Sequence, residues 1–131
     1  MVDLNRPVRK WEIYFADLNP TRGSEQRGIR PVLVLSCNEA NAALPVCTIA
    51  SFSSYKPNTK LYPSEIFIEK EITHLPKDSI LMLQQIRTIS KERLDERTVG
   101  LITNPSTKME INEKLEFLPY LCTLERILTK V

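Results

Sequence analysis

The chain has 131 residues, of which 42% are hydrophobic and 26% are charged, and its formal net charge is +2. This composition is that of an ordinary globular protein and excludes a disordered or collagen-like chain. The length predicts a single domain over residues 1–131, and the near-neutral charge does not by itself indicate a nucleic-acid-binding protein.

The cysteines and the first residues bear on the cellular compartment. Cys37, Cys47 and Cys122 lack the spacing of a zinc site, so we expect free thiols in a reducing cytoplasm. Residues 1–10 are polar, lack the apolar core of a signal peptide, and are predicted to form a loose arm. No apolar run approaches the roughly 20 residues that span a bilayer. The sequence therefore predicts a soluble, cytoplasmic protein with no membrane partner.

The first half of the chain predicts strands separated by turns. Residues 11–18 alternate with period two, which is typical of a half-buried strand. Residues 30–36 are apolar on both faces in their middle, which predicts a strand through the core. Residues 46–52 and 64–69 are two further predicted strands, and residues 38–43 favour one or two helical turns.

The second half continues this pattern and ends in a helix. A loop is predicted through Pro76, followed by the longest strand over residues 79–89, a single helical turn over 90–94 and a sixth strand over 98–103. Asn104 and Pro105 are an N-cap and a first helical residue, so we expect a helix over 105–118 that breaks near Pro119, with a second helix from Leu121. Five or six short strands and a C-terminal helix predict a mainly β protein, a small antiparallel barrel.

The residues that could carry chemistry are few. The sequence has no Gly-rich dinucleotide motif and no P-loop, and His74, in a predicted loop, is its one histidine. Arginine and hydroxyl groups can still act on RNA, because RNA supplies its own nucleophile, the 2′-OH. Attack on the adjacent phosphorus builds negative charge, which an arginine stabilises with two hydrogen bonds while a hydroxyl holds a second oxygen. Such a site needs no metal and no cofactor.

Two stretches resemble a known family. Residues 12–36, EIYFADLNPTRGSEQRGIRPVLVLS, resemble the opening of the MazF family, which includes the PemK and Kid toxins, and residues 78–94, DSILMLQQIRTISKERL, resemble its second motif. The resemblance implies a toxin of a type II toxin–antitoxin pair, folded as an SH3-like barrel and acting as a homodimer. It further implies sequence-specific, metal-independent cleavage of single-stranded RNA, mRNA included. The products would be 2′,3′-cyclic phosphate and 5′-OH ends. A cognate MazE-like antitoxin would lay an extended acidic segment over the RNA groove.

The resemblance also assigns site residues. Arg30, in GIRPV, matches the catalytic arginine of the family, unless it is a rim arginine paired with Glu25. The second catalytic residue is a threonine at the end of the third strand, and Pro45 places Ser53 there. Ser51 and Ser54 remain alternatives to Ser53 if the register differs.

A wider set of polar residues matches the family's RNA groove. The predicted RNA-binding residues are Asn19, Arg22, Ser24, Glu25, Gln26, Arg27, Gln85 and Arg87. Three of the arginines, Arg22, Arg27 and Arg30, lie within nine residues, although such a basic loop can also be merely solvated. Gln85 and Arg87 have an alternative role as internal hydrogen-bonding residues that hold the Arg30 loop. The choice of RNA sequence is expected to come from the loops at 19–29 and 54–63.

The chain departs from the family at several positions. Trp11 stands where family members usually have glycine, and Ser24, Met82 and Gln84 replace the His, Arg and Asp of Kid-like members. Two other functions therefore remain open. A CcdB-like protein of the same fold binds gyrase through a C-terminal aromatic ending, whereas this sequence ends in LERILTKV. The third possibility is a catalytically inactive member that only binds an antitoxin.

Overall fold

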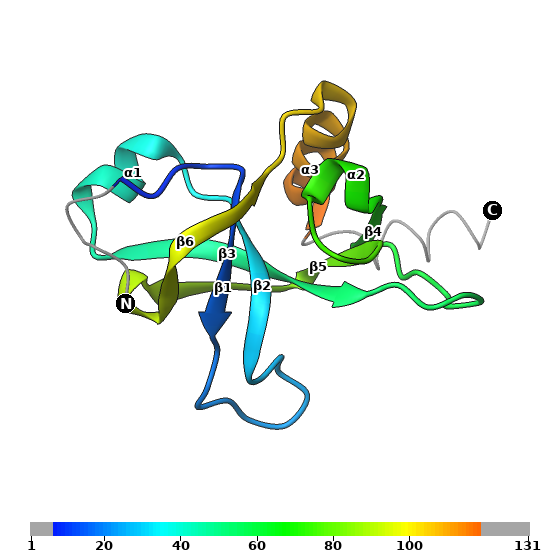
Figure 1. Ribbon diagram of the computed structural model, residues 1–131, viewed down its shortest axis with the longest axis horizontal. Helices are drawn as coiled ribbons and strands as arrows, with labels where there is room; N and C mark the ends of the chain where they lie inside the picture. Colours follow the sequence, from blue (N-terminus) through cyan, green and yellow to red (C-terminus); the bar gives the residue numbers. More distant parts are fainter. Residues whose placement is uncertain (1–6, 119–131) are drawn as a thin grey trace.

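The structure, a computed structural model, describes residues 7–118 and is a single antiparallel sheet with short helices (Figure 1). The sheet order is β4-β5-β3-β2-β1-β6. The elements in chain order are β1 (Glu12–Asp17), β2 (Ile29–Val34), α1 (Asn38–Ala43), β3 (Val46–Ser54), β4 (Glu65–Ile68), α2 (Lys70–Thr73), β5 (Ser79–Ser90), the 3-10 helix η1 (Lys91–Arg93), β6 (Leu94–Leu101) and α3 (Pro105–Phe117). This arrangement, with six strands, confirms the predicted mainly β fold of five or six strands, short helices and a C-terminal helix.

One predicted boundary was wrong, and one short helix was predicted as a loop. β6 begins at Leu94 rather than at residue 98, because Leu94 pairs with Ala16 of β1 and is buried, while the exposed polar residues that follow hide the strand pattern. α2 lies within the predicted loop before Pro76, and its four residues are too few to show helical periodicity. The second helix predicted from Leu121 lies outside the described residues.

The core consists of two apolar clusters on opposite faces of the curved sheet. Ile13 belongs to one cluster, and its neighbours Tyr14 and Ala16 belong to the other. The prediction that this strand is half-buried was therefore wrong, because both of its faces are covered. Val8 is 1% exposed and belongs to the second cluster, so the predicted loose arm packs against the sheet in the part that the structure describes, residues 7–10.

α3 begins where the sequence indicates. The side chain of Asn104 accepts a hydrogen bond from the backbone N–H of Thr107 at 3.0 Å, and Pro105 occupies the first turn. Ile111 is fully buried, and the Nζ of Lys114 donates to the carbonyl of Pro63 at 2.9 Å, which ties the helix to the segment before β4. Among residues 7–118, no helix has the length and apolar content to span a bilayer.

The pairing of β3 with β5 contains a large bulge. Ile49 pairs with Arg87 and Ser51 pairs with Met82, so Ala50 alone faces residues 83–86 of β5. A bulge of this kind bends the strand that carries the extra residues. Beyond the bend, the first part of β5 pairs with β4 as well as with β3, and residues 83–86 have no pairing partner on β3.

Trp11 adopts a left-handed backbone conformation that residues other than glycine rarely adopt. Its φ is 78°, its N–H donates to the carbonyl of Val34 at 2.9 Å, and its own carbonyl accepts from the N–H of Ile102 at 2.9 Å. The indole packs against the first apolar cluster and lies under the ammonium groups of Lys10 and Lys108, 5.0 and 5.5 Å from the ring centroid. These contacts offset the backbone strain at this position.

Replacing Trp11 by glycine or by alanine separates the strain from the packing. Both variants lose the indole contacts and are expected to be less stable than the wild type, but Trp11→Gly also removes the Cβ strain. We expect Trp11→Gly to exceed Trp11→Ala by about 1 kcal/mol in the free energy of unfolding. Urea unfolding followed by far-UV circular dichroism measures this difference. An alanine variant at least as stable as the glycine variant would contradict the strain at this residue.

Candidate active site

The two predicted catalytic residues lie on neighbouring strands at the same level. β2 and β3 are antiparallel with Val32 opposite Ser51, and continuing this register by two residues places Arg30 opposite Ser53. Both residues line one cavity of about 290 Å³. Cross-strand residues at the same level point to the same face of a sheet, so the guanidinium and the hydroxyl can reach one bound group together.

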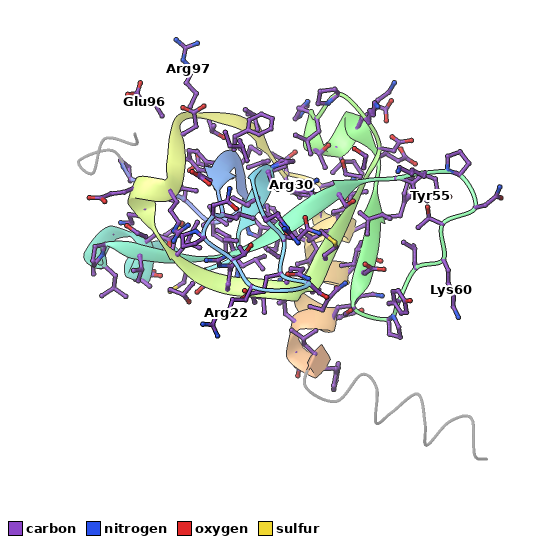
Figure 2. All side chains as sticks on the ribbon, turned by 90° about the horizontal axis from the view of Figure 1, so that it is seen from below. Arg22, Arg30, Tyr55, Lys60, Glu96 and Arg97 are labelled. Carbon is purple, nitrogen blue, oxygen red and sulfur yellow. The ribbon has the colours of Figure 1, made fainter. Side chains whose placement is uncertain are left out.

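The guanidinium of Arg30 is held at one nitrogen only. Its Nε donates to the carbonyl of Arg27 at 3.1 Å, and its two terminal nitrogens have no partner among the described residues. Glu25 does not neutralise it, because the Glu25 carboxylate accepts from the backbone N–H of Arg22 at 2.5 Å instead. Figure 2 shows Arg30 in the middle of the face in view, whereas Arg22 projects from its margin.

The structure distinguishes the three serines of β3. Ser51 is 1% exposed and its buried hydroxyl has no hydrogen-bond partner, so this hydroxyl is closed to a substrate. Ser53 is half-buried and lines the cavity. Ser54 also lines the cavity and is exposed, but successive strand residues alternate between faces, so Ser53 shares the face of Arg30.

The far wall of the cavity comes from a segment that sequence reasoning did not single out. Leu75, Pro76 and Lys77 follow α2 and line the cavity, together with Ser79 at the start of β5. The nearest signal in the sequence was the second family motif, which begins at Asp78, directly after Lys77. The rest of the lining is mostly apolar and is contributed by Phe15, Pro31 and Phe52.

The loop between β1 and β2 hangs below the sheet in Figure 1 and is closed by its own hydrogen bonds. Its ends are joined by Leu18, whose N–H donates to the carbonyl of Gly28 at 3.0 Å, and by Asn19, whose side-chain oxygen accepts from the N–H of Gly28 at 3.2 Å. Within the loop, Arg27 donates to the carbonyl of Gly23 at 3.3 Å. The positive φ angles of Gly23 and Gly28, 55° and 79°, permit this tight path.

Side chains from the bulge of β5 and the following residues hold this loop. The side-chain oxygen of Gln85 accepts from the backbone N–H of Gln26 at 3.1 Å, and its amide nitrogen donates to the carbonyl of Ser24 at 3.4 Å. Arg87 donates to the carbonyl of Leu18 at 3.3 Å. The geometry of Gln85 and Arg87 thus fits the internal, loop-holding role that was the alternative to RNA contact.

Arg93 is a further loop-holding residue that sequence reasoning missed. Its guanidinium donates to the carbonyl of Asp17 at 3.1 Å and also to the carbonyl of Asn19. The residue lies in η1, at the end of the second family motif, and no pattern in that motif separates it from a solvated arginine. Gln26, a predicted RNA-binding residue, differs from Arg93: its side-chain oxygen is buried and has no hydrogen-bond partner.

Loss of the Gln85 side chain should loosen the loop. Gln85→Ala removes both hydrogen bonds to residues 24–26, whereas Gln85→Glu keeps the acceptor for the N–H of Gln26. We expect trypsin to cut Gln85→Ala after Arg22 and Arg27 about 5-fold to 10-fold faster than the wild type, since about 1–1.5 kcal/mol of loop closure is lost. The cleavage rate of Gln85→Glu should fall between those of Gln85→Ala and the wild type. Equal cleavage rates measured by mass spectrometry for all three proteins would show that Gln85 does not order the loop.

Other candidate nucleophiles do not fit. Burial raises the pKa of the Cys47 thiol to about 11 despite the opposing effect of Lys91, so the thiol stays protonated and unreactive. His74 is exposed, ends α2 in a left-handed conformation and does not line the cavity. Within residues 7–118, no group of three or more His, Cys, Asp or Glu residues could hold a metal ion.

Comparison with known proteins gives one consistent family. Residues 9–118 match the model of the PemK-like, MazF-like toxins of type II toxin–antitoxin systems. The chain is 36% identical over 109 residues to the endoribonuclease MazF of Staphylococcus epidermidis, and the match covers 83% of this chain and 88% of that protein.

Solved structures show the same fold. MazF from Deinococcus radiodurans superposes with a TM-score of 0.66 at 24% identity and covers 86% of this chain and 96% of that chain. A MazE–MazF structure from the same organism gives a TM-score of 0.67 at 18% identity, covering 88% and 99% of the two chains. A mycobacterial endoribonuclease in complex with its cognate antitoxin gives 0.63 at 20% identity, covering 84% and 90%.

Proposed function

The chain belongs to the PemK-like, MazF-like toxins of type II toxin–antitoxin systems, and from this premise we propose that it is a sequence-specific endoribonuclease acting on single-stranded RNA without a metal. One observation carries the proposal. Arg30 and Ser53 line a single cavity, and the terminal nitrogens of Arg30 have no partner among the described residues. A charged donor paired with a hydroxyl can stabilise the negative charge that develops in phosphoryl transfer.

The proposed reaction uses the 2′-OH of the RNA as nucleophile. The 2′-oxygen gives its proton to water and bonds to the adjacent phosphorus, the bond from phosphorus to the 5′-oxygen breaks, and the 5′-oxygen takes a proton from water. The products are a 2′,3′-cyclic phosphate and a 5′-hydroxyl. Arg30 binds the non-bridging oxygens where negative charge develops, and the Ser53 hydroxyl donates to one of them. Arg30 is fixed by its Nε bond to Arg27, so little reorganisation is needed.

The RNA-binding residues divide into two groups under this proposal. Gln85, Arg87, Asn19 and Glu25 act indirectly, because their side chains are already engaged in shaping the β1–β2 loop. Exposed side chains of that loop remain available to contact the RNA strand directly. The guanidinium of Arg22 is the clearest of these, because it projects into solvent and has no partner among residues 7–118 (Figure 2).

We further propose that the protein works in the cytoplasm as a homodimer neutralised by a MazE-like antitoxin. Some of the structurally similar proteins are MazF chains solved together with MazE. Large apolar side chains are exposed beside a second cavity, which lies between α3 and the β3–β4 connection and could be covered by a second copy. They are Leu61, Tyr62 and Phe67, and α3 adds Met109 and Phe117.

Replacing Arg30 tests the proposed chemistry. Arg30→Ala is expected to reduce the cleavage of a long single-stranded RNA in EDTA by at least about 100-fold, since removal of one such donor has effects of this size. Arg97→Ala, on an exposed position of β6, is the charge-matched control and should cleave like the wild type. Intact RNA with the wild-type protein would contradict the proposal, and trapped gyrase–DNA complexes in its place would favour a CcdB-like function.

Replacing the serines of β3 tests the partner of Arg30. Ser53→Ala should lower kcat by about 10-fold to 100-fold, because a donor to the charged oxygen is lost. Ser53→Thr should retain activity, since it keeps the hydroxyl and restricts its rotamer. Ser54→Ala provides the matched comparison, with an expected loss of less than about 3-fold. A larger loss in Ser54→Ala than in Ser53→Ala would move the catalytic hydroxyl to Ser54.

A further inference from the structure

We propose that Lys77 binds the scissile phosphodiester together with Arg30, as a second cation in the same cavity. The inference rests on the proposed function and adds to it a residue that no motif indicated. Lys77 precedes the second family motif, but in the fold it forms part of the wall of the cavity lined by Arg30 and Ser53.

The backbone around Lys77 is fixed on both sides. The Ser79 hydroxyl donates to the carbonyl of Lys77 at 3.0 Å, and the next residue, Asp78, accepts from the N–H of Lys70 at 2.9 Å through its side chain. The carbonyl of Asp78 also accepts from the N–H of Tyr55, just beyond the end of β3, at 2.9 Å. The Cα of Lys77 is therefore held in a set position, and only its side chain is free to adjust to a ligand.

α2 supports the wall segment of the cavity, residues 75–77. Gly100 of β6 lies so close to α2 that a Cβ at this position would be 2.1 Å from the carbonyl oxygen of Thr73. Thr73 is fully buried, and its hydroxyl accepts from the N–H of Leu75, the first residue of the wall, at 3.1 Å. Close packing thus links the sheet to Lys77 through a short and well-supported segment.

The charge of the cavity is positive and not neutralised by the protein. Its charged lining residues are Arg30 and Lys77, and no carboxylate lines it. The ammonium of Lys77 forms no hydrogen bond or ion pair with any other residue in the range 7–118, and the terminal nitrogens of Arg30 are also without partners there. Two like charges around one small cavity repel each other unless an anion lies between them.

A phosphodiester undergoing attack is an anion of suitable charge. It carries one negative charge in the ground state and close to two in the transition state, so a second cation gains attraction as the reaction proceeds. Lysine contacts phosphate as a point charge, whereas arginine forms the bidentate contact. Arg30 and Lys77 therefore have complementary roles, and Lys77 is expected to affect kcat more than KM.

The test compares three variants in the full-length protein. Lys77→Met removes the charge at similar side-chain length, Lys77→Arg retains it, and Lys70→Met is the charge-matched control, since Lys70 is exposed on α2 and does not line the cavity. Thermal unfolding checks that each variant is folded. Cleavage in EDTA gives kcat and KM. Binding of a 2′-deoxy-substituted, uncleavable RNA between 50 and 300 mM salt counts the phosphate contacts independently of cleavage.

Lys77→Met is expected to lower kcat by about 10-fold to 100-fold and to reduce the slope of log affinity against log salt by about 0.7, the value for one phosphate contact on a single strand. Lys77→Arg should retain most of the wild-type kcat and most of the wild-type salt slope. If the wild type cleaves and Arg30→Ala does not, but Lys77→Met behaves like Lys70→Met, the role of Lys77 is excluded while the proposed function stands. RNA left intact by the wild type would overturn both.

Discussion

The arrangement of the site depends on the bulge that separates the two halves of the β3–β5 pairing. Opposite the single residue Ala50, β5 inserts residues 83–86, and this bends the strand. On one side of the bend β5 pairs with β4, and Gln84 donates to the carboxylate of Glu65 at 2.9 Å. The next residue of the bulge, Gln85, reaches the β1–β2 loop. One irregularity in one strand therefore contacts both β4 and the β1–β2 loop.

The polar groups of the cavity and of the β1–β2 loop fall into two sets with different roles. Asn19, Gln85, Arg87 and Arg93 use their side chains on backbone groups of the chain, which fixes the loop but leaves them little capacity for a ligand. The terminal nitrogens of Arg30, in contrast, have no partner in the described part of the chain. A rigid frame that presents an unneutralised charge is the arrangement that electrostatic catalysis requires, because the donors need not reorganise during the reaction.

The sequence predicted the parts of this site that short-range patterns encode. Alternation and apolar runs placed the strands. The first motif identified Arg30, and the family resemblance with the register set by Pro45 identified Ser53; the structure brings both residues to one cavity. The other parts depend on long-range contacts. The bulge follows from the register between two strands, α2 is too short for periodicity, and Lys77 joins Arg30 in lining one cavity only through the tertiary fold. None of these leaves a local signal in the chain.

The same electrostatics bears on inhibition. A cavity that holds two cations and no carboxylate favours any anion that reaches it, whether a phosphodiester or an acidic side chain. If the antitoxin carries an acidic extended segment, as the family resemblance implies, that segment would compete with RNA for the charges that accelerate cleavage. Inhibition would then need no change of conformation in the toxin, because occupying Arg30 and Lys77 would remove the transition-state stabilisation that we propose for them. We infer that substrate binding and neutralisation share one physical cause.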